Sequence, residues 1–345
     1  MSTTRRPLTT AAALATATLL TVPLAACSTS STPVSNPAGT SGAASPAVTS
    51  TTAVPATVAP VAAQGDADWK PVADVLGRTG KLSDHNTVYR IPLTRTDLHV
   101  QTGGVDIAPG LSLGGYAAFV RYPDTTMVMG DLVVTEDELS KVTDALHSHG
   151  IAQTALHKHQ LAQTPPVWWT HIQAMGDPAT LATGLRDVLA TTAIPGPTPP
   201  PATAPAPAPA PALDLNTAAI DAALGRTGTA DGGLYKFTFA RADTITDEGH
   251  VLPPGTGVTT AITFQPFGGG KAAINGDFAL TDPEIQPVIT ALRAGHIAIV
   301  ELHNHMLTEQ PRLFFLHYWA VDDAATLATA LRPALDATHL APAPK

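Results

Sequence analysis

"GDLVVTEDE" at residues 130–138 recurs as "GDFALTDPE" at residues 276–284. In both stretches an apolar, strand-like segment leads into Thr-x-x-Glu, the spacing of a capping box at the start of a helix. In a capping box the threonine hydroxyl and the glutamate carboxylate bind backbone amides that the first helical turn leaves without partners. Both stretches therefore predict a strand that is followed directly by a capped helix.

The similarity covers most of two long segments. "LGRTG" at residues 76–80 recurs at residues 224–228, and from residue 130 to residue 186 the copies align without a gap. Three histidine pairs recur at the same offset of 146 residues: His157 with His303, His159 with His305, and His171 with His317. A sequence that repeats in this way predicts two copies of one fold.

The fold class follows from the pattern within each copy. Alternation of apolar and polar residues predicts strands at 86–95, 115–122 and 126–134, with counterparts at 234–241, 259–266 and 271–280. A helix follows in each copy, then two strands around the histidines, and then a second helix. This order predicts the α+β class: two homologous two-layer domains, each with a mainly antiparallel sheet and helices on one face. We expect a ferredoxin-like topology.

The start of the chain has the features of an export signal. Arg5 and Arg6 precede a short apolar run, and "LAAC" ends this segment at Cys27, the only cysteine in the chain. The stretch resembles a bacterial lipoprotein precursor, which is cut before a cysteine that carries lipid. We expect residues 1–26 to be a signal peptide and Cys27 to be the lipidation site. The protein would be exported and lipid-anchored to the outer face of the bacterial membrane or envelope.

Two low-complexity segments set the domain boundaries. Residues 27–66 are rich in Ser, Thr, Ala and Pro, and predict a flexible tether after the lipidated cysteine. Residues 195–212 alternate proline with alanine, and predict an extended linker. The remaining segments, 67–194 and 213–340, are the expected repeat domains 1 and 2.

Composition limits the classes of partner. The chain has 345 residues, of which 44% are hydrophobic, so two packed cores are possible. Its formal net charge is −9, and no cluster of Lys or Arg offsets this charge. A nucleic-acid partner is therefore not expected, and attachment to the membrane would depend on the lipid of Cys27.

The stretch "ELHNHMLTEQPRLFFLHYW" at residues 301–319 contains the candidate site. In a strand, His303 and His305 would point to the same side. A hairpin turn centred near Gln310 would place His303 opposite His317, so that three imidazoles share one face. Such a set could hold a divalent transition metal such as Zn, Fe, Mn or Cu.

Glu309 distinguishes the second copy from the first, which has Gln163 at the matching position. This carboxylate could be a fourth metal ligand or the base that activates a metal-bound water, which would make it catalytic. The first copy is expected to be a weaker, secondary metal site, made of His157, His159 and His171. The alternative is that the histidines only form hydrogen bonds within a partly buried sheet face.

Other repeated polar residues allow two interpretations. Arg241, Asp243 and Asp277 could line a polar cleft that faces the histidines. We favour the alternative, in which the Arg-Asp pairs are structural ion pairs and the Gly-Asp pairs, of which Asp277 is one, organise a bend.

The order "YKF", "RAD", "GD", "TDPE", "ELHNHML", "EQPRLFFLHYWA" and "LATALRPALD" resembles the LppY/LpqO-like lipoprotein family. That resemblance implies an exported bacterial protein with tandem domains, and it brings no known reaction. The first functional hypothesis is an envelope protein that binds a small ligand or a metal. The second is a metal-dependent enzyme, hydrolase or oxygen-handling, and a third is a structural envelope protein.

Overall fold

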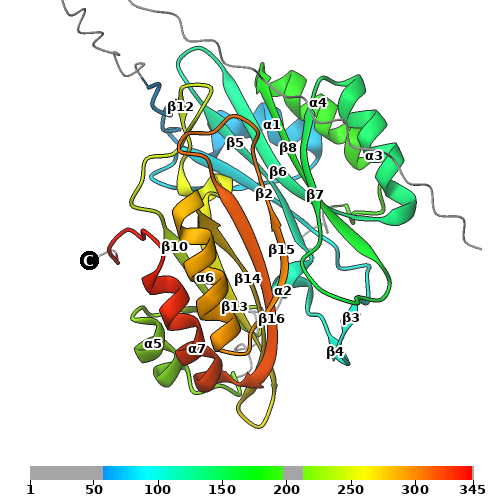
Figure 1. The fold of residues 1–345 in the computed structure, drawn as a ribbon. Helices are drawn as coiled ribbons and strands as arrows, with labels where there is room; N and C mark the ends of the chain where they lie inside the picture. The colour runs from blue at the N-terminus through cyan, green and yellow to red at the C-terminus, as the bar shows by residue number, and fades with distance from the viewer. Residues whose placement is uncertain (1–56, 197–212, 344–345) are drawn as a thin grey trace, which may run out of the picture. The chain divides into compact units, whose positions relative to one another are not determined.

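The computed structural model describes residues 57–196 and 213–343 (Figure 1). The expected signal peptide, Cys27, most of the tether and most of the linker lie outside the described residues. Both repeats belong to a single compact unit, Val54–Lys345. Among the described residues, no helix combines the length and apolar character needed to cross a bilayer.

The first repeat contains a six-stranded antiparallel sheet with the order β1-β2-β5-β6-β8-β7. Its elements in chain order are η1 (Asp66–Trp69), α1 (Lys70–Leu76), β1 (Lys81–Ser83), β2 (Val88–Thr94), β3 (Gln101–Thr102), β4 (Val105–Asp106), α2 (Pro109–Ser112), β5 (Gly114–Arg121), β6 (Thr126–Thr135), α3 (Glu136–Ser148), β7 (Ala152–His157), β8 (Val167–Gly176) and α4 (Pro178–Leu189). The short strands β3 and β4 form a separate hairpin.

The second repeat has the same arrangement, with the sheet order β9-β10-β13-β14-β16-β15. Its elements are α5 (Thr217–Leu224), β9 (Thr229–Asp231), β10 (Leu234–Ala240), β11 (Thr246–Asp247), β12 (His250–Val251), η2 (Pro254–Thr256), β13 (Thr259–Gly268), β14 (Lys271–Leu280), α6 (Asp282–Ala294), β15 (Ala298–His303), β16 (Phe314–Asp323) and α7 (Ala324–Asp336). The predicted α+β class with two similar antiparallel-sheet domains is confirmed.

Both capping boxes are present, at Thr135 with Glu138 and at Thr281 with Glu284. The expected ferredoxin-like topology is not observed. That topology has the order βαββαβ, whereas here β2, β5 and β6 all precede α3 and are neighbours in the sheet, with only the four-residue helix α2 between β2 and β5. Alternation predicts which segments form strands, but it does not predict which strands are neighbours.

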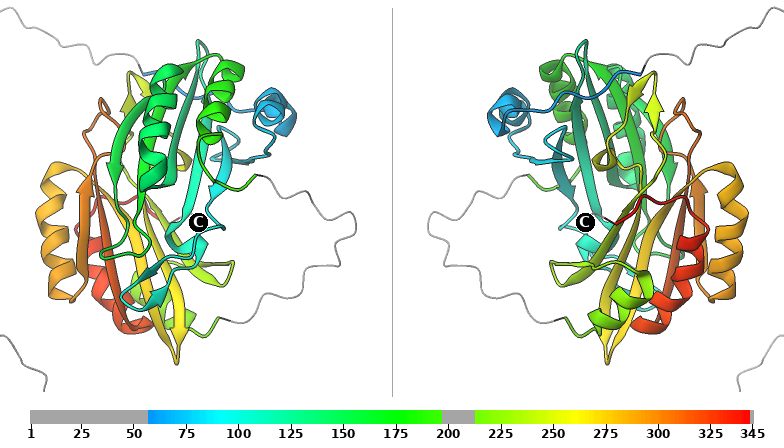
Figure 2. Two further views of the ribbon diagram at one scale, coloured as in Figure 1. Left: turned by 90° about the vertical axis from the view of Figure 1, so that its right-hand side faces the viewer. Right: turned by 90° about the vertical axis from the view of Figure 1, so that its left-hand side faces the viewer.

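Each sheet is covered by its helices on one face and by the other repeat on the opposite face (Figures 1 and 2). In β6, Val128 and Leu132 pack in the core with residues of α3 and α4. Met127 and Met129 point the other way and pack with residues of the second repeat, such as Phe315. The inner faces of the two sheets therefore meet, and side chains on these faces can form a shared site.

The repeated Arg-Asp pairs are structural. The guanidinium of Arg95 is 1% exposed and donates hydrogen bonds to Asp97, to the carbonyl of Val133 and to Glu138 of the capping box. Burial alone would raise the pKa of Glu138, but amide hydrogen bonds and Arg95 hold that pKa below its usual value. Arg241 makes the same contacts in the second repeat, with Asp243, Ala279 and Glu284.

Candidate metal centre between the repeats

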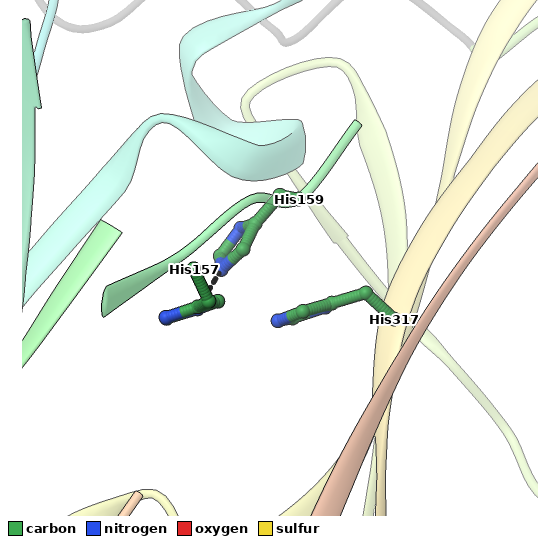
Figure 3. A group of neighbouring side chains, drawn as sticks. All are labelled: His157, His159 and His317. Carbon is green, nitrogen blue, oxygen red and sulfur yellow. Dashed lines mark hydrogen bonds between the residues drawn. The ribbon is translucent and has the colours of Figure 1, made fainter. Parts of the chain in front are cut away.

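The six repeated histidines form one cluster between the two sheets. Three close ring contacts each join one repeat to the other: His157 with His303, at 3.8 Å between ring centroids, His171 with His305, at 3.7 Å, and His159 with His317, at 4.0 Å. Figure 3 shows His157 and His159 on the segment that ends β7, facing His317 on β16 of the second repeat. The histidines of the two expected sites, one per repeat, therefore lie together in one cluster.

The hairpin register differs from the predicted one. His303 pairs with Phe315 and Glu301 pairs with His317, and the ladder has a one-residue irregularity between Ile299 and Glu301. His303 and His317 remain on one sheet face, since the offset from the predicted pairing is two residues and side chains alternate with a period of two. Their ring centroids lie 4.8 Å apart.

His305 lies in the loop after β15 rather than in a strand, because the strand ends at His303. The first repeat holds this loop in place. Thr154 donates a hydrogen bond from its hydroxyl to the carbonyl of His305 (2.5 Å), and the side-chain amide of Asn304 donates to the carbonyl of Thr154 (2.8 Å). Contacts between the repeats therefore help to hold His305 in the cluster.

Backbone carbonyls fix the orientation of several rings. Nδ1 of His317 lies 2.8 Å from the carbonyl oxygen of Gly276, and Nδ1 of His305 lies 3.0 Å from that of Gly257. A carbonyl only accepts hydrogen bonds, so both Nδ1 atoms carry the proton and both Nε2 atoms present a lone pair. This arrangement is usual for histidines that bind a metal through the other nitrogen.

The first repeat has matching contacts. His171 forms a hydrogen bond with the backbone of Gly130, and His159 forms one with the backbone of Ser112. Among the described residues of the cluster, the following buried ring nitrogens have no hydrogen-bond partner: Nδ1 of His157, Nε2 of His171, both nitrogens of His303, Nε2 of His305 and Nε2 of His317. So many buried nitrogens without partners in one cluster are unusual in a folded protein.

The Gly-Asp pairs lie in the middle of β6 and β14 and do not organise a bend. A side chain at Gly276 would overlap the carbonyl oxygen of Ala261 on the neighbouring strand and the hydroxyl of Tyr318. A side chain at Gly130 would overlap the carbonyl oxygen of Tyr116. Glycine is therefore needed for close packing at the positions whose carbonyls orient His317 and His171.

Two buried aspartates complete the cluster. Oδ2 of Asp131 lies 3.8 Å from Nε2 of His159 and 3.9 Å from Nε2 of His171. Oδ2 of Asp277 lies 3.2 Å from Nε2 of His305. Burial raises the pKa of Asp277 to about 6, and burial together with the charge of Asp277 raises the pKa of Asp131 well above its usual value. A cation between these carboxylates would relieve both effects.

The surroundings of five cluster histidines favour the uncharged imidazole. Burial, and then the charges of the neighbouring rings, lower the pKa values of these five well below the usual range: His157, His159, His171, His303 and His305. A neutral imidazole has a free lone pair and is the form that binds metal ions.

Three overlapping groups have ligand atoms within 4.8 Å of one another: His157, His159 and His317; His157, His171 and His303; and Asp277, His303 and His317. The first two combine both repeats. The Nε2 atoms of His157 and His159 lie 3.0 Å apart. Two nitrogens bound to one tetrahedral zinc ion would be separated by a similar distance, about 3.3 Å. The cluster therefore has the donor types and the spacing for a transition metal ion.

Glu309 lies in the loop between β15 and β16 and is fully buried. One carboxylate oxygen accepts a hydrogen bond from the amide of Leu313 (2.8 Å), and the other binds Arg312 (3.1 Å). In the first repeat, Gln163 donates its side-chain N–H to the carbonyl of Val167, the residue that corresponds to Leu313. Position 309 thus braces this loop, and none of the three candidate ligand groups includes it.

The three residues expected to line one polar cleft lie in two different places. Asp277 lies at the cluster, together with its counterpart Asp131. Arg241 and Asp243 instead contact Glu284 and His339 and line a different cavity. A cleft of about 510 Å³ leads to the cluster, and its lining includes Asp131, Asp277, His159, His171, His305, His317, Arg90 and Tyr116.

A family model matches residues 70–191 and residues 218–337, one match per repeat. The chain belongs to the family described as Domain of Unknown Function (DUF1259). No curated protein matches the sequence. Two solved structures are similar. One is a trimeric bacterial microcompartment shell protein, PduB, with 12% identity and a TM-score of 0.19, which covers 76% of this chain and 91% of that one. The other is EtuB from Clostridium kluyveri, with 11% identity and a TM-score of 0.17, which covers 75% and 89%. These scores support no argument about function.

The sequence pattern identified all six histidines of the cluster between the two DUF1259 repeats but missed part of the site. Asp131 and Asp277 could be recognised as a repeated pair, because each follows a glycine in a predicted strand. In the structure this strand pairs with the strand that carries His171 or His317. Arg90 and Tyr116 gave no signal, because neither is matched by the same residue type in the second repeat. Strand pairing within the first repeat places Tyr116 beside Asp131, and Arg90 lies over the Tyr116 ring.

Proposed function

We propose that this protein binds a divalent transition metal ion between its two DUF1259 repeats. The observation that carries the proposal is the set of unpartnered ring nitrogens in a buried cluster, where the opposite nitrogens of His305 and His317 are already bound by carbonyls. A buried polar atom without a partner costs about 1–3 kcal/mol. A metal ion would remove this cost for several nitrogens at once.

The donor set favours Zn, Fe, Mn or Cu. Imidazole nitrogens suit Zn, Cu and Fe, and carboxylates add affinity for Mn. Calcium and magnesium bind mainly oxygen ligands, and the cluster offers six imidazoles against two carboxylates, Asp131 and Asp277. Because two of the candidate ligand groups combine the repeats, the ion would also connect them.

The place of action that we propose is the outer face of a bacterial membrane, with the chain anchored by lipid on Cys27. The support is the order of basic residues, apolar run and "LAAC" in the sequence, together with the resemblance to the LppY/LpqO-like lipoproteins. In that place the protein would act as an envelope protein that binds a metal or a small ligand.

A metal-dependent enzyme, hydrolase or oxygen-handling, is the second candidate. The observation that favours it is the cleft of about 510 Å³ that reaches Asp131, Asp277 and four of the histidines. A bound ion with an open position toward such a cleft could activate water or a substrate. Turnover by the metal-loaded protein, and its loss in a variant that still binds metal, would distinguish the enzyme from the binding protein.

Metal content tests the proposal directly. The full chain would be purified in detergent, loaded with Zn, Fe, Mn or Cu in turn, and analysed by mass spectrometry for bound metal. We expect at least one ion per chain, and a large loss in both His157→Ala and His303→Ala, since each residue occurs in two ligand groups. His147→Ala is the matched control, because His147 is exposed on α3.

Circular dichroism would show whether each variant keeps its fold. Wild-type protein without stoichiometric metal after loading would contradict the proposal. Equal loss from the variants in the two repeats would support a shared site, whereas loss only in His303→Ala would support a site confined to the second repeat.

A further inference from the structure

The cleft beside the cluster is asymmetric, although the cluster is nearly symmetric. Asp131 pairs with Tyr116 on β5, and its counterpart Asp277 pairs with Ala261 on β13. The second repeat thus has a methyl group where the first has a phenol. The two walls of the cleft therefore differ at the positions next to the two aspartates.

The charge of the walls differs in the same way. Arg90 on β2 lines the cleft, and its counterpart on β10 is Lys236, at the same offset as the histidine pairs. The ammonium of Lys236 lies 2.7 Å from Asp231 and does not line the cleft. Arg90 is the only Lys or Arg among the described residues that line this cleft.

Arg90 is held with most of its donors free. Its guanidinium carbon lies 3.3 Å from the centroid of the Tyr116 ring, and Nη1 donates one hydrogen bond to the carbonyl of Gly255 (2.6 Å). Among the described residues this is its one hydrogen bond at good geometry. The Tyr116 hydroxyl is fixed in turn by a hydrogen bond to the carbonyl of Thr256 (3.1 Å). A guanidinium stacked on an aromatic ring in this way is oriented for a bidentate contact with an anion.

We propose that the cleft binds a small molecule with a carboxylate or phosphate group, and that Arg90 holds that group. The inference rests on the proposed metal site, because the ion would contact the other end of the same molecule. A volume of about 510 Å³ suits a small ligand. Arginine binds planar carboxylates and phosphates through two parallel hydrogen bonds, and Tyr116 keeps its guanidinium in place.

The charges in the cleft make this binding depend on metal. Asp84, Asp131 and Asp277 line the cleft with Arg90, so without an ion its lining repels anions. A divalent cation would offset two negative charges. We therefore expect tight anion binding in the metal-loaded protein and weaker binding in the metal-free protein. The competing role for Arg90 is that of a counter-ion for Asp131. Its positive charge opposes the increase in the pKa of Asp131 that burial causes.

Calorimetry on the full chain in detergent distinguishes these roles, with inorganic phosphate and oxalate as separate probes. We expect at least one probe to bind the metal-loaded wild type, and Arg90→Gln to weaken that binding about tenfold or more, because charge-assisted hydrogen bonds are lost. Arg90→Lys should bind the probe more tightly than Arg90→Gln and more weakly than the wild type. Lysine keeps the positive charge but cannot make the two parallel hydrogen bonds of a guanidinium. Lys236→Gln is the matched control and should change the affinity less than twofold.

Each outcome has a defined meaning. Failure of both probes to bind the metal-loaded wild type overturns the inference, and so does equal anion affinity in the wild type and in Arg90→Gln. A wild type that binds no metal overturns the proposed function, whereas Arg90-dependent anion binding in that protein would still support the anion site. Metal content measured on Arg90→Gln tests whether the cluster is intact. It should equal that of the wild type, because Arg90 is in none of the ligand groups.

Discussion

At the scale of one residue, Gly257 connects the histidine cluster to the wall of the cleft. Its carbonyl binds Nδ1 of His305, and its φ of +98° lies in the region that favours glycine. A side chain here would overlap the hydroxyl of Tyr116. One residue thus orients a candidate ligand and also makes room for the ring that supports Arg90.

Gly257→Ala is expected to weaken both metal binding and folding. The backbone strain alone should cost about 1 kcal/mol of unfolding free energy or more, and the overlap with Tyr116 adds to it. Gly249→Ala is the matched control, because Gly249 has a φ of +80° and open space around it. The measurements are urea denaturation and metal content. Equal effects of the two substitutions would contradict a specific role for Gly257.

Arg95→Ala should be strongly destabilising. Arg95 is 1% exposed and its partner Glu138 is 8% exposed, so the substitution leaves a buried carboxylate without its cation. Breaking a buried ion pair in this way costs about 3–5 kcal/mol. Urea denaturation would measure the loss, and Arg241→Ala should match it in the second repeat. Arg186→Ala, in an exposed ion pair, should have little effect.

The histidine loops are the elements that the sequence predicted least well. The predicted hairpin put His303 opposite His317, whereas the observed pairing of His303 with Phe315 differs from it by two residues. His303 and His317 still share a face, because side chains alternate with a period of two. The position of His305 could not be predicted, since the loop is held by Thr154, far away in the chain.

Glu309→Gln tests whether this loop residue is a ligand or a brace. We expect metal content to stay unchanged, because Glu309 contacts Leu313 and Arg312 rather than the histidines. Glutamine can still accept the hydrogen bond from Leu313, as its side chain has a carbonyl oxygen. A loss of stability of about 1 kcal/mol is expected from the weaker contacts. Metal lost from a folded Glu309→Gln protein would restore Glu309 as a ligand.

At the scale of the whole molecule, the repeat predicted much of the fold and only part of the site. Duplicated patterns predicted the class, the main strands and both capped helices, because these depend on neighbours in the sequence. The joining of two inner faces into one cluster could not be predicted. The proline-rich linker between the repeats suggested separate domains, and the sequence does not show that residues such as Met127 and Phe315 pack together.

Acid should destabilise the metal-free protein. Five histidines have folded-state pKa values well below 6.5, so the unfolded chain takes up protons first and the unfolding free energy falls as pH drops below about 6.5. Each such group contributes a slope of at most about 1.4 kcal/mol per pH unit. Asp277, whose folded-state pKa is about 6, acts in the opposite direction between about pH 6 and its usual value, and the raised pKa of Asp131 acts in the same direction as that of Asp277, but they are two against five.

Urea denaturation of the metal-free full chain at pH 8, 7, 6 and 5 would measure this dependence. His157→Gln should reduce the slope, because it removes one of the five groups. Unfolding free energy that stays constant or rises from pH 7 to pH 5 would contradict the assigned pKa shifts.

The difference between Arg90 and Lys236 has a consequence that reaches beyond the cleft. If two identical chains built this cluster, every substitution would appear on both sides, and both walls would carry the same residues. A single chain with two unequal copies has no such restriction. The histidines can stay matched between the two repeats while one wall alone carries a cation, so a ligand in the cleft would be held in one defined direction.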